Sequence, residues 1–212
     1  MARAQRLVDV SVLLKPGIPV YPGNPPFEMT PVKRLATGDS SNVSQITMGT
    51  HTATHVDAPR HSFDDKPGVD ALPLDLLIGR ARVIDLPHRG GITEAHLGAA
   101  GLREDLRVLF KTPNSALWNS SDGFHSDYTY LSPGGAKFLV DQGVKVVGVD
   151  YLSVEQFNAA GAPAHHMLLG NGVIVIEGLN LSDAEAGQYE MYCLPLRIAD
   201  ADGAPARVVL KR

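Results

Sequence analysis

Apolar and polar positions along the chain predict many strands and few helices. The segments 144–149 and 173–177 are nearly all apolar and β-branched, as strands buried on both faces of a sheet usually are. Less regular runs predict the other strands, at 7–14, 32–36, 42–48, 81–86, 107–112, 189–198 and 206–210. Strands therefore dominate the expected fold.

Helices are expected at only a few places. Ser132 is suited to cap a helix that has Pro133 in its first turn and ends at Gly143. Shorter helical segments are expected from Thr93 onward, at 165–170 and, as a helical or irregular turn, at 72–77. A helix that leads into a buried strand in the second half indicates one compact α/β domain over residues 1–212, with a mixed, barrel-like central sheet.

The segment 15–26 contains five prolines and two glycines, so we expect an extended loop outside helices and sheet ladders. A long, rigid loop of this kind often reaches across a site or a partner subunit. Tyr21 lies in its middle, where the ring either faces a substrate or packs on the neighbouring prolines. The polar segment 114–125 is also expected to be irregular.

Composition excludes several classes of function. The net charge of −4 and the pI near 6.0 give no electrostatic basis for binding nucleic acid or an anionic membrane. No signal peptide or transmembrane helix is expected from the sequence. The single cysteine, Cys193, lies in an apolar run and allows no internal disulfide, which suits a cytoplasmic protein.

Three histidines and an aspartate lie within eleven residues, at His51, His55, Asp57 and His61. All four occupy odd positions, so an extended strand would present them on one face. A helix would turn Asp57 about 200° away from His55, and Pro59 also disfavours a helix. Imidazole nitrogen and carboxylate oxygen are the ligands of zinc and similar divalent metals.

A second pair of candidate ligands lies later in the chain. Glu177 ends a buried strand, where a carboxylate must be exposed, protonated or paired with a cation. His165 begins the short helix that leads into this strand, so the two side chains can meet, whereas the adjacent His166 would point elsewhere. Taken alone, the pair also fits a surface helix start and an exposed strand end.

Together these five residues exceed the needs of a single zinc ion. Three ligands from the first stretch and two from the second suit a two-metal site in which Asp57 is the bridge. Such a site activates water near neutral pH. His61 is then free to transfer a proton, because the pKa of histidine lies near working pH.

The motif His51-Thr-Ala-Thr-His55-Val-Asp57-Ala-Pro-Arg-His61 resembles the signature of the cyclase family of metal-dependent hydrolases, which includes kynurenine formamidases and isatin hydrolases. Ala53 stands where glycine is common in that signature. The resemblance continues through 148–153, 165–177, 189–196 and 202–207, and therefore spans nearly the whole chain.

The resemblance implies a swivelling β/β/α fold and two divalent ions per subunit, Zn²⁺ with Mn²⁺ as the alternative. One ion would be held by His51, His55 and Asp57, the other by Asp57, His165 and Glu177, with His61 as the proton donor and acceptor. It further implies a small-molecule substrate and a homodimer or homotetramer.

Two departures concern the substrate. Kynurenine formamidases carry a substrate-contacting tryptophan in the Pro-rich loop, where this chain has Tyr21. They also tend to have the sequence Asp-Thr-Pro-Ser after the central strand, where this chain has Asp150-Tyr-Leu-Ser153. The expected reaction is hydrolysis of the amide C–N bond of a small aromatic or cyclic substrate, in the manner of a kynurenine formamidase. An isatin hydrolase-like opening of a cyclic amide is the alternative, and a non-catalytic metal-binding protein is a third possibility.

Overall fold

Seven strands close into a ring in the part of the chain that the computed structural model describes, residues 6–102, 105–120 and 123–212. Around the ring they are β12 (Gly203–Lys211), β11 (Gly187–Pro195), β5 (Ile78–Asp85), β7 (Arg107–Lys111), β9 (Val146–Val149), β10 (Ile174–Glu177) and β4 (His55–Asp57). The short strand β4 pairs with both β10 and β12 and thereby completes the ring. Strand β1 (Leu7–Asp9) pairs with β12 beside the ring.

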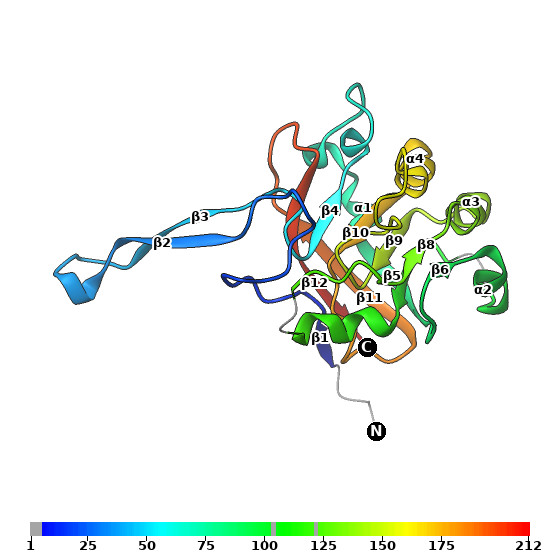
Figure 1. Cartoon of the computed structure of the whole chain (residues 1–212), viewed down its shortest axis with the longest axis horizontal. Coiled ribbons are helices and arrows are strands. Elements are labelled where there is room, and N and C mark those ends of the chain that lie inside the picture. Colours follow the sequence, from blue (N-terminus) through cyan, green and yellow to red (C-terminus); the bar gives the residue numbers. More distant parts are fainter. Residues whose placement is uncertain (1–5, 103–104, 121–122) are drawn as a thin grey trace.

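Helices cover the parallel half of this barrel (Figure 1). Strands β5, β7, β9 and β10 run parallel, and the remaining pairs of the ring are antiparallel. The covering helices are α2 (Glu94–Ala99), α3 (Pro133–Asp141) and α4 (Pro163–Gly170), whereas the short helix α1 (Leu74–Leu77) packs Leu77 into the barrel interior. A small sheet joins β6 (Gly91–Ile92) to β8 (Tyr130–Leu131). The mixed barrel with few helices confirms the predicted α/β fold class.

Side chains of the parallel strands alternate between two cores. On β7, Leu109 packs into the barrel interior, whereas Val108 and Phe110 pack outward against the helices. On β10, Ile176 points inward and Val175 outward. Burying each such side chain contributes about 1.5–3 kcal/mol, so both faces need apolar residues. This explains the uninterrupted apolar runs in the sequence.

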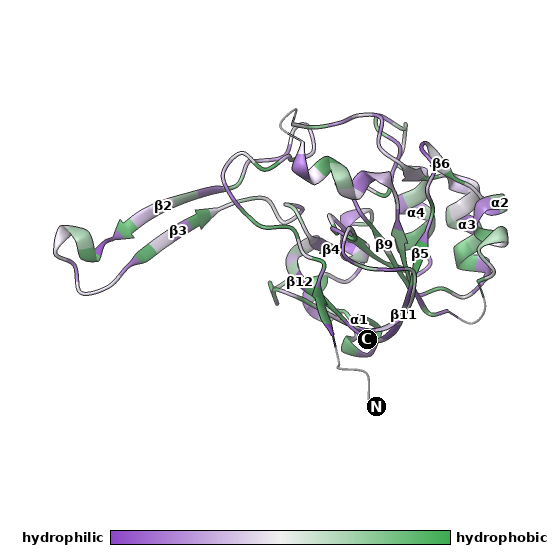
Figure 2. Ribbon diagram, turned by 90° about the horizontal axis from the view of Figure 1, so that it is seen from below, coloured by the Kyte–Doolittle hydropathy of each residue, from purple (hydrophilic) through white to green (hydrophobic). Residues whose placement is uncertain are grey.

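A two-stranded arm projects from the barrel (Figures 1 and 2). It consists of β2 (Glu28–Lys33), β3 (Val43–Thr47) and a 3₁₀ turn, Leu35–Thr37, near its tip. The two strands pair with each other and with no other strand of the described chain. The strand expected at 32–36 is therefore displaced toward the N-terminus.

Several element predictions were wrong in detail. The first strand ends at Asp9, because the side chain of Ser11, and not its backbone, then bonds Val208 of β12, and Ser11 forms an isolated bridge to Leu179. The segment expected to be irregular from residue 114 includes a 3₁₀ helix, Pro113–Asn119, which begins where the Thr112 side chain accepts a hydrogen bond from the Asn114 N–H. Strands β4, β6 and β8 have two or three residues each, too few for a periodic signal.

Membrane insertion by a helix finds no support in the structure. Within residues 6–102, 105–120 and 123–212, no helix has the length and apolar character needed to cross a bilayer.

Gly178→Ala is expected to destabilise the fold more than Gly172→Ala. Both glycines have left-handed backbones, with φ of +70° and +71°, so each substitution should cost about 1–2 kcal/mol in strain. At Gly178 the new Cβ would also lie 1.9 Å from the Ala53 carbonyl oxygen, whereas at Gly172 it would meet nothing within 4 Å. Crowding should add about 1–3 kcal/mol at Gly178, measurable as the difference in urea unfolding. Equal losses for the two variants would contradict this packing.

Candidate metal centre

Strand β4 places His55 and Asp57 beside the end of β10. His55 lies opposite Glu177, and Asp57 lies opposite Val175. Because side chains alternate along a strand, these polar groups point away from the barrel interior, where Val56 packs. His55 Nε2 lies 3.2 Å from Asp57 Oδ1 and 3.4 Å from Glu177 Oε2, and all three side chains are buried. The barrel wall thus carries a buried cluster on its outer face.

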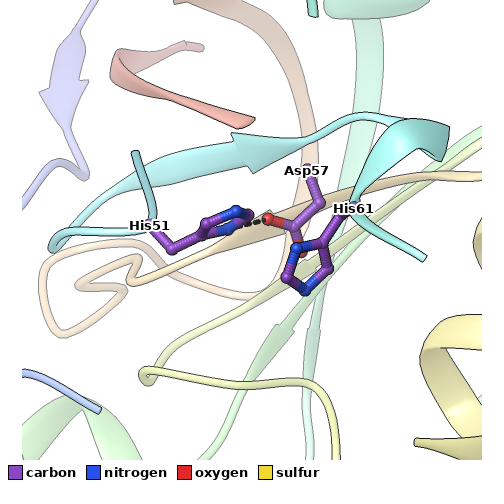
Figure 3. Close-up of side chains that lie close together, drawn as sticks. All are labelled: His51, Asp57 and His61. Carbon is purple, nitrogen blue, oxygen red and sulfur yellow. Dashed lines mark hydrogen bonds and ion pairs between the residues drawn. The ribbon is translucent and has the colours of Figure 1, made fainter. Parts of the chain in front are cut away.

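His51 reaches the same carboxylate from the turn that precedes β4. Its Nδ1 atom lies 2.8 Å from Asp57 Oδ1 (Figure 3). The chain turns at Ala53, which has a φ of 55°. His55 Nδ1 bonds the Ala53 carbonyl oxygen at 2.8 Å, which leaves His55 Nε2 facing the carboxylates.

The single extended segment predicted over 51–61 was wrong. Only His55–Asp57 is a strand, because the chain turns before it and Pro59 begins a 3₁₀ helix, Pro59–His61, after it. The side chains converge nevertheless, from a turn, a strand and a 3₁₀ helix. Strand alternation therefore accounts only for His55 and Asp57, and the turn and the 3₁₀ helix bring His51 and His61 to them.

His165 comes to the cluster from α4. Its Nε2 atom lies 3.2 Å from Glu177 Oε1 and 3.7 Å from Asp57 Oδ2, and its side chain is buried. The adjacent His166 is exposed, and its ring contacts Phe63 at a centroid distance of 5.3 Å. His165 rather than His166 thus faces the carboxylates, in agreement with the sequence-based expectation.

His61 lies at the exposed edge of the cluster. Its ring centroid is 4.1 Å from that of His51 and 5.3 Å from that of His165. Figure 3 shows its ring beside Asp57, close to His51. Neither ring nitrogen of His61 takes part in a hydrogen bond within the described structure, which sets it apart from the other three histidines.

Two residues missed by the sequence interpretation hold the outer sides of these rings. Asp202 Oδ2 lies 2.9 Å from His51 Nε2. Glu155 Oε2 lies 3.5 Å from His165 Nδ1 and accepts hydrogen bonds from the backbone N–H groups of Ala164 and His165. Asp202 is 151 positions from His51, and no local pattern connects Glu155 with His165.

The arrangement fits a metal centre. His51, His55 and His165 each direct one ring nitrogen at Asp57 or Glu177 and engage a carboxylate or carbonyl oxygen with the other, as metal-ligating histidines do. Furthermore, His55 Nε2 and Asp57 Oδ2 are buried without a hydrogen-bond partner, an expensive state that a bound cation would relieve.

Asp57 is common to both candidate ligand groups in the described chain. One group contains His51, Asp57 and His61, and the other contains His55, Asp57 and Glu177, with the ligand atoms of each group within 4.8 Å of one another. The geometry therefore admits His61 as a ligand as well as a proton-transfer group. The division of ligands between two ions stays a prediction.

A cavity of about 280 Å³ adjoins the cluster. Its lining includes Tyr21, His51, His61, Ser153, His165 and Glu177. Tyr21 contacts Phe124 and Phe157 edge-on, at centroid distances of 5.6 and 5.8 Å, rather than packing only on its neighbouring prolines. The Pro-rich loop thus brings an aromatic side chain to the cavity that the histidines share.

Asp150, which follows strand β9, has a structural role. Its carboxylate accepts hydrogen bonds from the backbone and hydroxyl groups of both Thr112 and Ser115. The Trp118 indole N–H donates to the Asp150 and Leu179 carbonyl oxygens. Asp150 therefore anchors the 3₁₀ helix that follows β7.

Charge coupling perturbs the whole cluster. Burial alone would lower the pKa of His55, but the carboxylates of Asp57 and Glu177 raise it to about 10. Burial would raise the pKa of Asp57, yet the neighbouring histidines hold it well below its usual value. For His61, partial burial and the nearby His51 lower the pKa. Among the four histidines of the cluster, His61 is thus the one whose pKa is lowered, whereas the pKa values of His51, His55 and His165 are raised.

Comparisons with known proteins support one family throughout. The Cyclase family model matches residues 8–156. Kynurenine formamidase from Geobacillus thermodenitrificans is 39% identical over 207 residues, 97% of each chain. A solved structure described as a potential metal-dependent hydrolase with cyclase activity is 35% identical, with a TM-score of 0.85 over 98% of each chain. Isatin hydrolase A from Labrenzia aggregata is 25% identical, with a TM-score of 0.86 over 98% of this chain and 94% of that one.

Without metal, the protein is expected to lose stability as pH rises from about 6.5 to about 10. The pKa of His55 is raised from 6.5 to about 10 on folding, so its stabilising effect is complete below the unfolded pKa and disappears as pH passes the folded pKa. Thermal unfolding of chelator-treated protein across this range measures the loss, on the order of several kcal/mol. Asp57→Asn should flatten the slope, and a rise in stability over this range would contradict the coupling.

Proposed function

The chain belongs to the cyclase family of metal-dependent hydrolases, and we propose that it hydrolyses the amide C–N bond of a small aromatic substrate, as a kynurenine formamidase does. The observation that carries this proposal is the arrangement of His51, His55 and His165. In each ring, one nitrogen contacts an oxygen that fixes the ring's orientation, and the other nitrogen points at the carboxylate of Asp57 or Glu177. An open cavity adjoins the set, as catalysis requires and a closed structural site would not.

The proposed ligands are His51, His55 and Asp57 for one ion and Asp57, His165 and Glu177 for the other. Two ions per subunit accommodate five ligands, and Zn²⁺ or Mn²⁺ suits nitrogen and carboxylate donors. When bound, such ions polarise a carbonyl group and lower the pKa of water to about 7. Glu155 and Asp202 keep the His165 and His51 rings in the orientation that this requires.

His61 is the proposed proton carrier. It lines the cavity and has the lowered pKa of a histidine that is neutral at working pH. A ring nitrogen can therefore accept a proton from the attacking water and return it to the departing nitrogen as the C–N bond breaks. The products are a carboxylic acid and an amine.

The substrate is proposed to be small and aromatic or cyclic. The cavity, about 280 Å³, is near the lower end of the range for ligand sites. Tyr21, supported by Phe124 and Phe157, offers an aromatic surface to a planar ring. Isatin hydrolase A, a structural relative, was solved with benzyl benzoate bound. Because isatin is a cyclic amide and isatin hydrolase A is a structural relative, opening of a cyclic amide is the second candidate reaction.

A substrate panel separates the two reactions. N-formylkynurenine, formylanthranilate and isatin would be supplied to metal-loaded protein, and product formation followed by absorbance. Preferential turnover of the formyl amides supports the formamidase proposal, and preferential turnover of isatin supports the cyclic amide. Failure to hydrolyse any member would contradict the proposed substrate class.

We further propose that residues 1–212 form one hydrolase domain, which acts in the cytoplasm as a homodimer or homotetramer. The extent of the relatives supports the single domain, because they match nearly the whole chain. The only cysteine, Cys193, is buried, and burial raises the pKa of its thiol to about 12, so it is protected from oxidation.

His61→Ala should retain both ions and lose roughly 10²–10⁴-fold in turnover, because only proton transfer is removed. Metal content by atomic emission and kcat on the preferred substrate are the two readouts. His166→Ala, an exposed histidine on α4, is the matched control and should change neither. Loss of an ion from His61→Ala would reassign His61 as a ligand, and unchanged turnover would refute its role in proton transfer.

Asp57→Ala should remove both ions, since the carboxylate is shared between them. The expected result is less than one ion retained per chain after dialysis, against two for the parent protein. Asp64→Ala, which changes an exposed aspartate in a nearby loop, should retain two. Two retained ions in the Asp57 variant would count against the bridging role.

A further inference from the structure

Three carboxamide side chains line the cavity beside the metal centre. Asn24 comes from the Pro-rich loop, and Gln156 and Asn158 come from the loop between β9 and α4. Gln156 and Asn158 are exposed to solvent, whereas His165 and Glu177 of the metal centre are buried. The two exposed side chains therefore lie at the mouth of the cavity, on its solvent side.

An aromatic contact brings these carboxamides to the same cavity. The ring of Phe157 lies edge-on to the ring of Tyr21, with a centroid distance of 5.8 Å, and Phe157 is not part of the cavity lining. Its neighbours in sequence, Gln156 and Asn158, are part of the lining. On the other loop, the Asn24 N–H donates to the Tyr21 carbonyl oxygen at 3.0 Å, which closes a turn. The two loops thus meet through their rings and present their amides to the cavity.

The loop that carries Gln156 and Asn158 is held in place by its own hydrogen bonds. Its first part is fixed by Glu155, whose carboxylate accepts hydrogen bonds from two backbone N–H groups of α4 at 2.8 and 3.2 Å. The Ala159 N–H donates to the Gln156 carbonyl oxygen at 3.0 Å. Asn158 has a φ of 60°, a left-handed conformation that asparagine tolerates better than most residues. Substrate binding therefore need not order a flexible loop, which lowers its entropic cost.

The charge of the cavity lining favours a substituent that carries no net charge. Among the described residues that line the cavity, Glu155 and Glu177 are acidic and none is a lysine or an arginine. A substrate carboxylate is commonly bound by arginine, whose guanidinium donates two parallel hydrogen bonds to it. A carboxamide instead offers a donor and an acceptor without a charge. It can bond the ammonium and the carboxylate of a zwitterion, or an uncharged polar group.

We propose that Asn24, Gln156 and Asn158 form a carboxamide subsite for a polar substituent of the aromatic substrate. The subsite takes a substituent without net charge, such as a zwitterionic α-amino acid, and selects against one with a net negative charge. The amide to be cleaved then lies at the histidines, the ring beside Tyr21, and the substituent at the mouth of the cavity. This inference rests on the proposed hydrolysis of a small aromatic amide and specifies which substituents the site selects.

Removal of a carboxamide should weaken the preference for the zwitterionic substituent. The matched substrates are N-formylkynurenine and 2-formamidoacetophenone, which has the same formyl amide and aryl ketone but lacks the amino acid. In Gln156→Ala the ratio of kcat/KM for the first substrate to that for the second should fall about 10-fold, as expected for one hydrogen bond to a charged group. Asn158→Gly, which suits the left-handed backbone, should lower the ratio similarly.

Gln142→Ala is the matched control, because Gln142 is an exposed glutamine at the end of α3 and does not line the cavity. It should keep the ratio of the parent protein. Circular dichroism checks that all variants are folded. An unchanged ratio in both Gln156→Ala and Asn158→Gly would overturn the proposal.

A cation placed at the mouth tests the selection by charge. Formylanthranilate carries a carboxylate at the ring position where N-formylkynurenine carries its side chain, and formanilide carries nothing there. Gln156→Lys should raise the ratio of kcat/KM for formylanthranilate to that for formanilide about fivefold, because an opposite charge nearby attracts the carboxylate. Gln142→Lys adds the same charge away from the cavity and should not change the ratio. Equal effects of the two lysines, or none from Gln156→Lys, would overturn the selection by charge.

Binding of the reaction product separates the subsite from the catalytic assignment. Calorimetric titration of metal-loaded protein gives the Kd of kynurenine and of 2-aminoacetophenone, its counterpart without the amino acid, and requires no hydrolysis. Kynurenine should bind about 10-fold more tightly, and Gln156→Ala should remove most of this difference. If the difference is present but formyl amides are not hydrolysed, the subsite stands and the hydrolase assignment fails. If formyl amides are hydrolysed but kynurenine binds no more tightly, the subsite proposal fails alone.

Discussion

The carboxylate of Asp57 is completely buried, and the rest of the site is arranged to keep it ionised. Isolated in a protein interior, such a group would take up a proton, because burial penalises the charged form. Instead, the rings of His51, His55 and His165 approach it within 2.8 to 3.7 Å. Glu177 adds a second buried negative charge to the same space. Two carboxylates surrounded by oriented imidazoles form a site made for cations.

The barrel meets this requirement through its shortest ring strand. Strand β4 closes the ring between β10 and β12, so His55 and Asp57 are fixed by hydrogen bonds to strands on both sides. Helix α4 then covers the outer face and contributes His165. Gly178 completes the packing, because only glycine allows β10 to end so close to the Ala53 carbonyl group. The same short strand thus closes the barrel and positions two residues of the site.

Much of this organisation could be predicted from the sequence, for physical reasons that also mark its limits. Buried parallel strands appear in the sequence as apolar runs, and closely spaced histidines and aspartate indicate a metal site. The contact of Asp202 with His51 could not be predicted, because it joins segments 151 residues apart. The turn at Ala53 was missed because its left-handed backbone suits glycine better than alanine. The exposure of the arm could not be predicted either, because a strand that packs on the barrel and a strand that is exposed can have the same apolar pattern.

The central claim is that Asp57 lies between two metal ions. The most direct test is a crystal structure of protein loaded with zinc, with anomalous scattering recorded on both sides of the zinc absorption edge. We expect two edge-dependent peaks, each within bonding distance of an Asp57 carboxylate oxygen, one beside His51 and His55 and the other beside His165 and Glu177. A single peak, or none in contact with Asp57, would contradict the account.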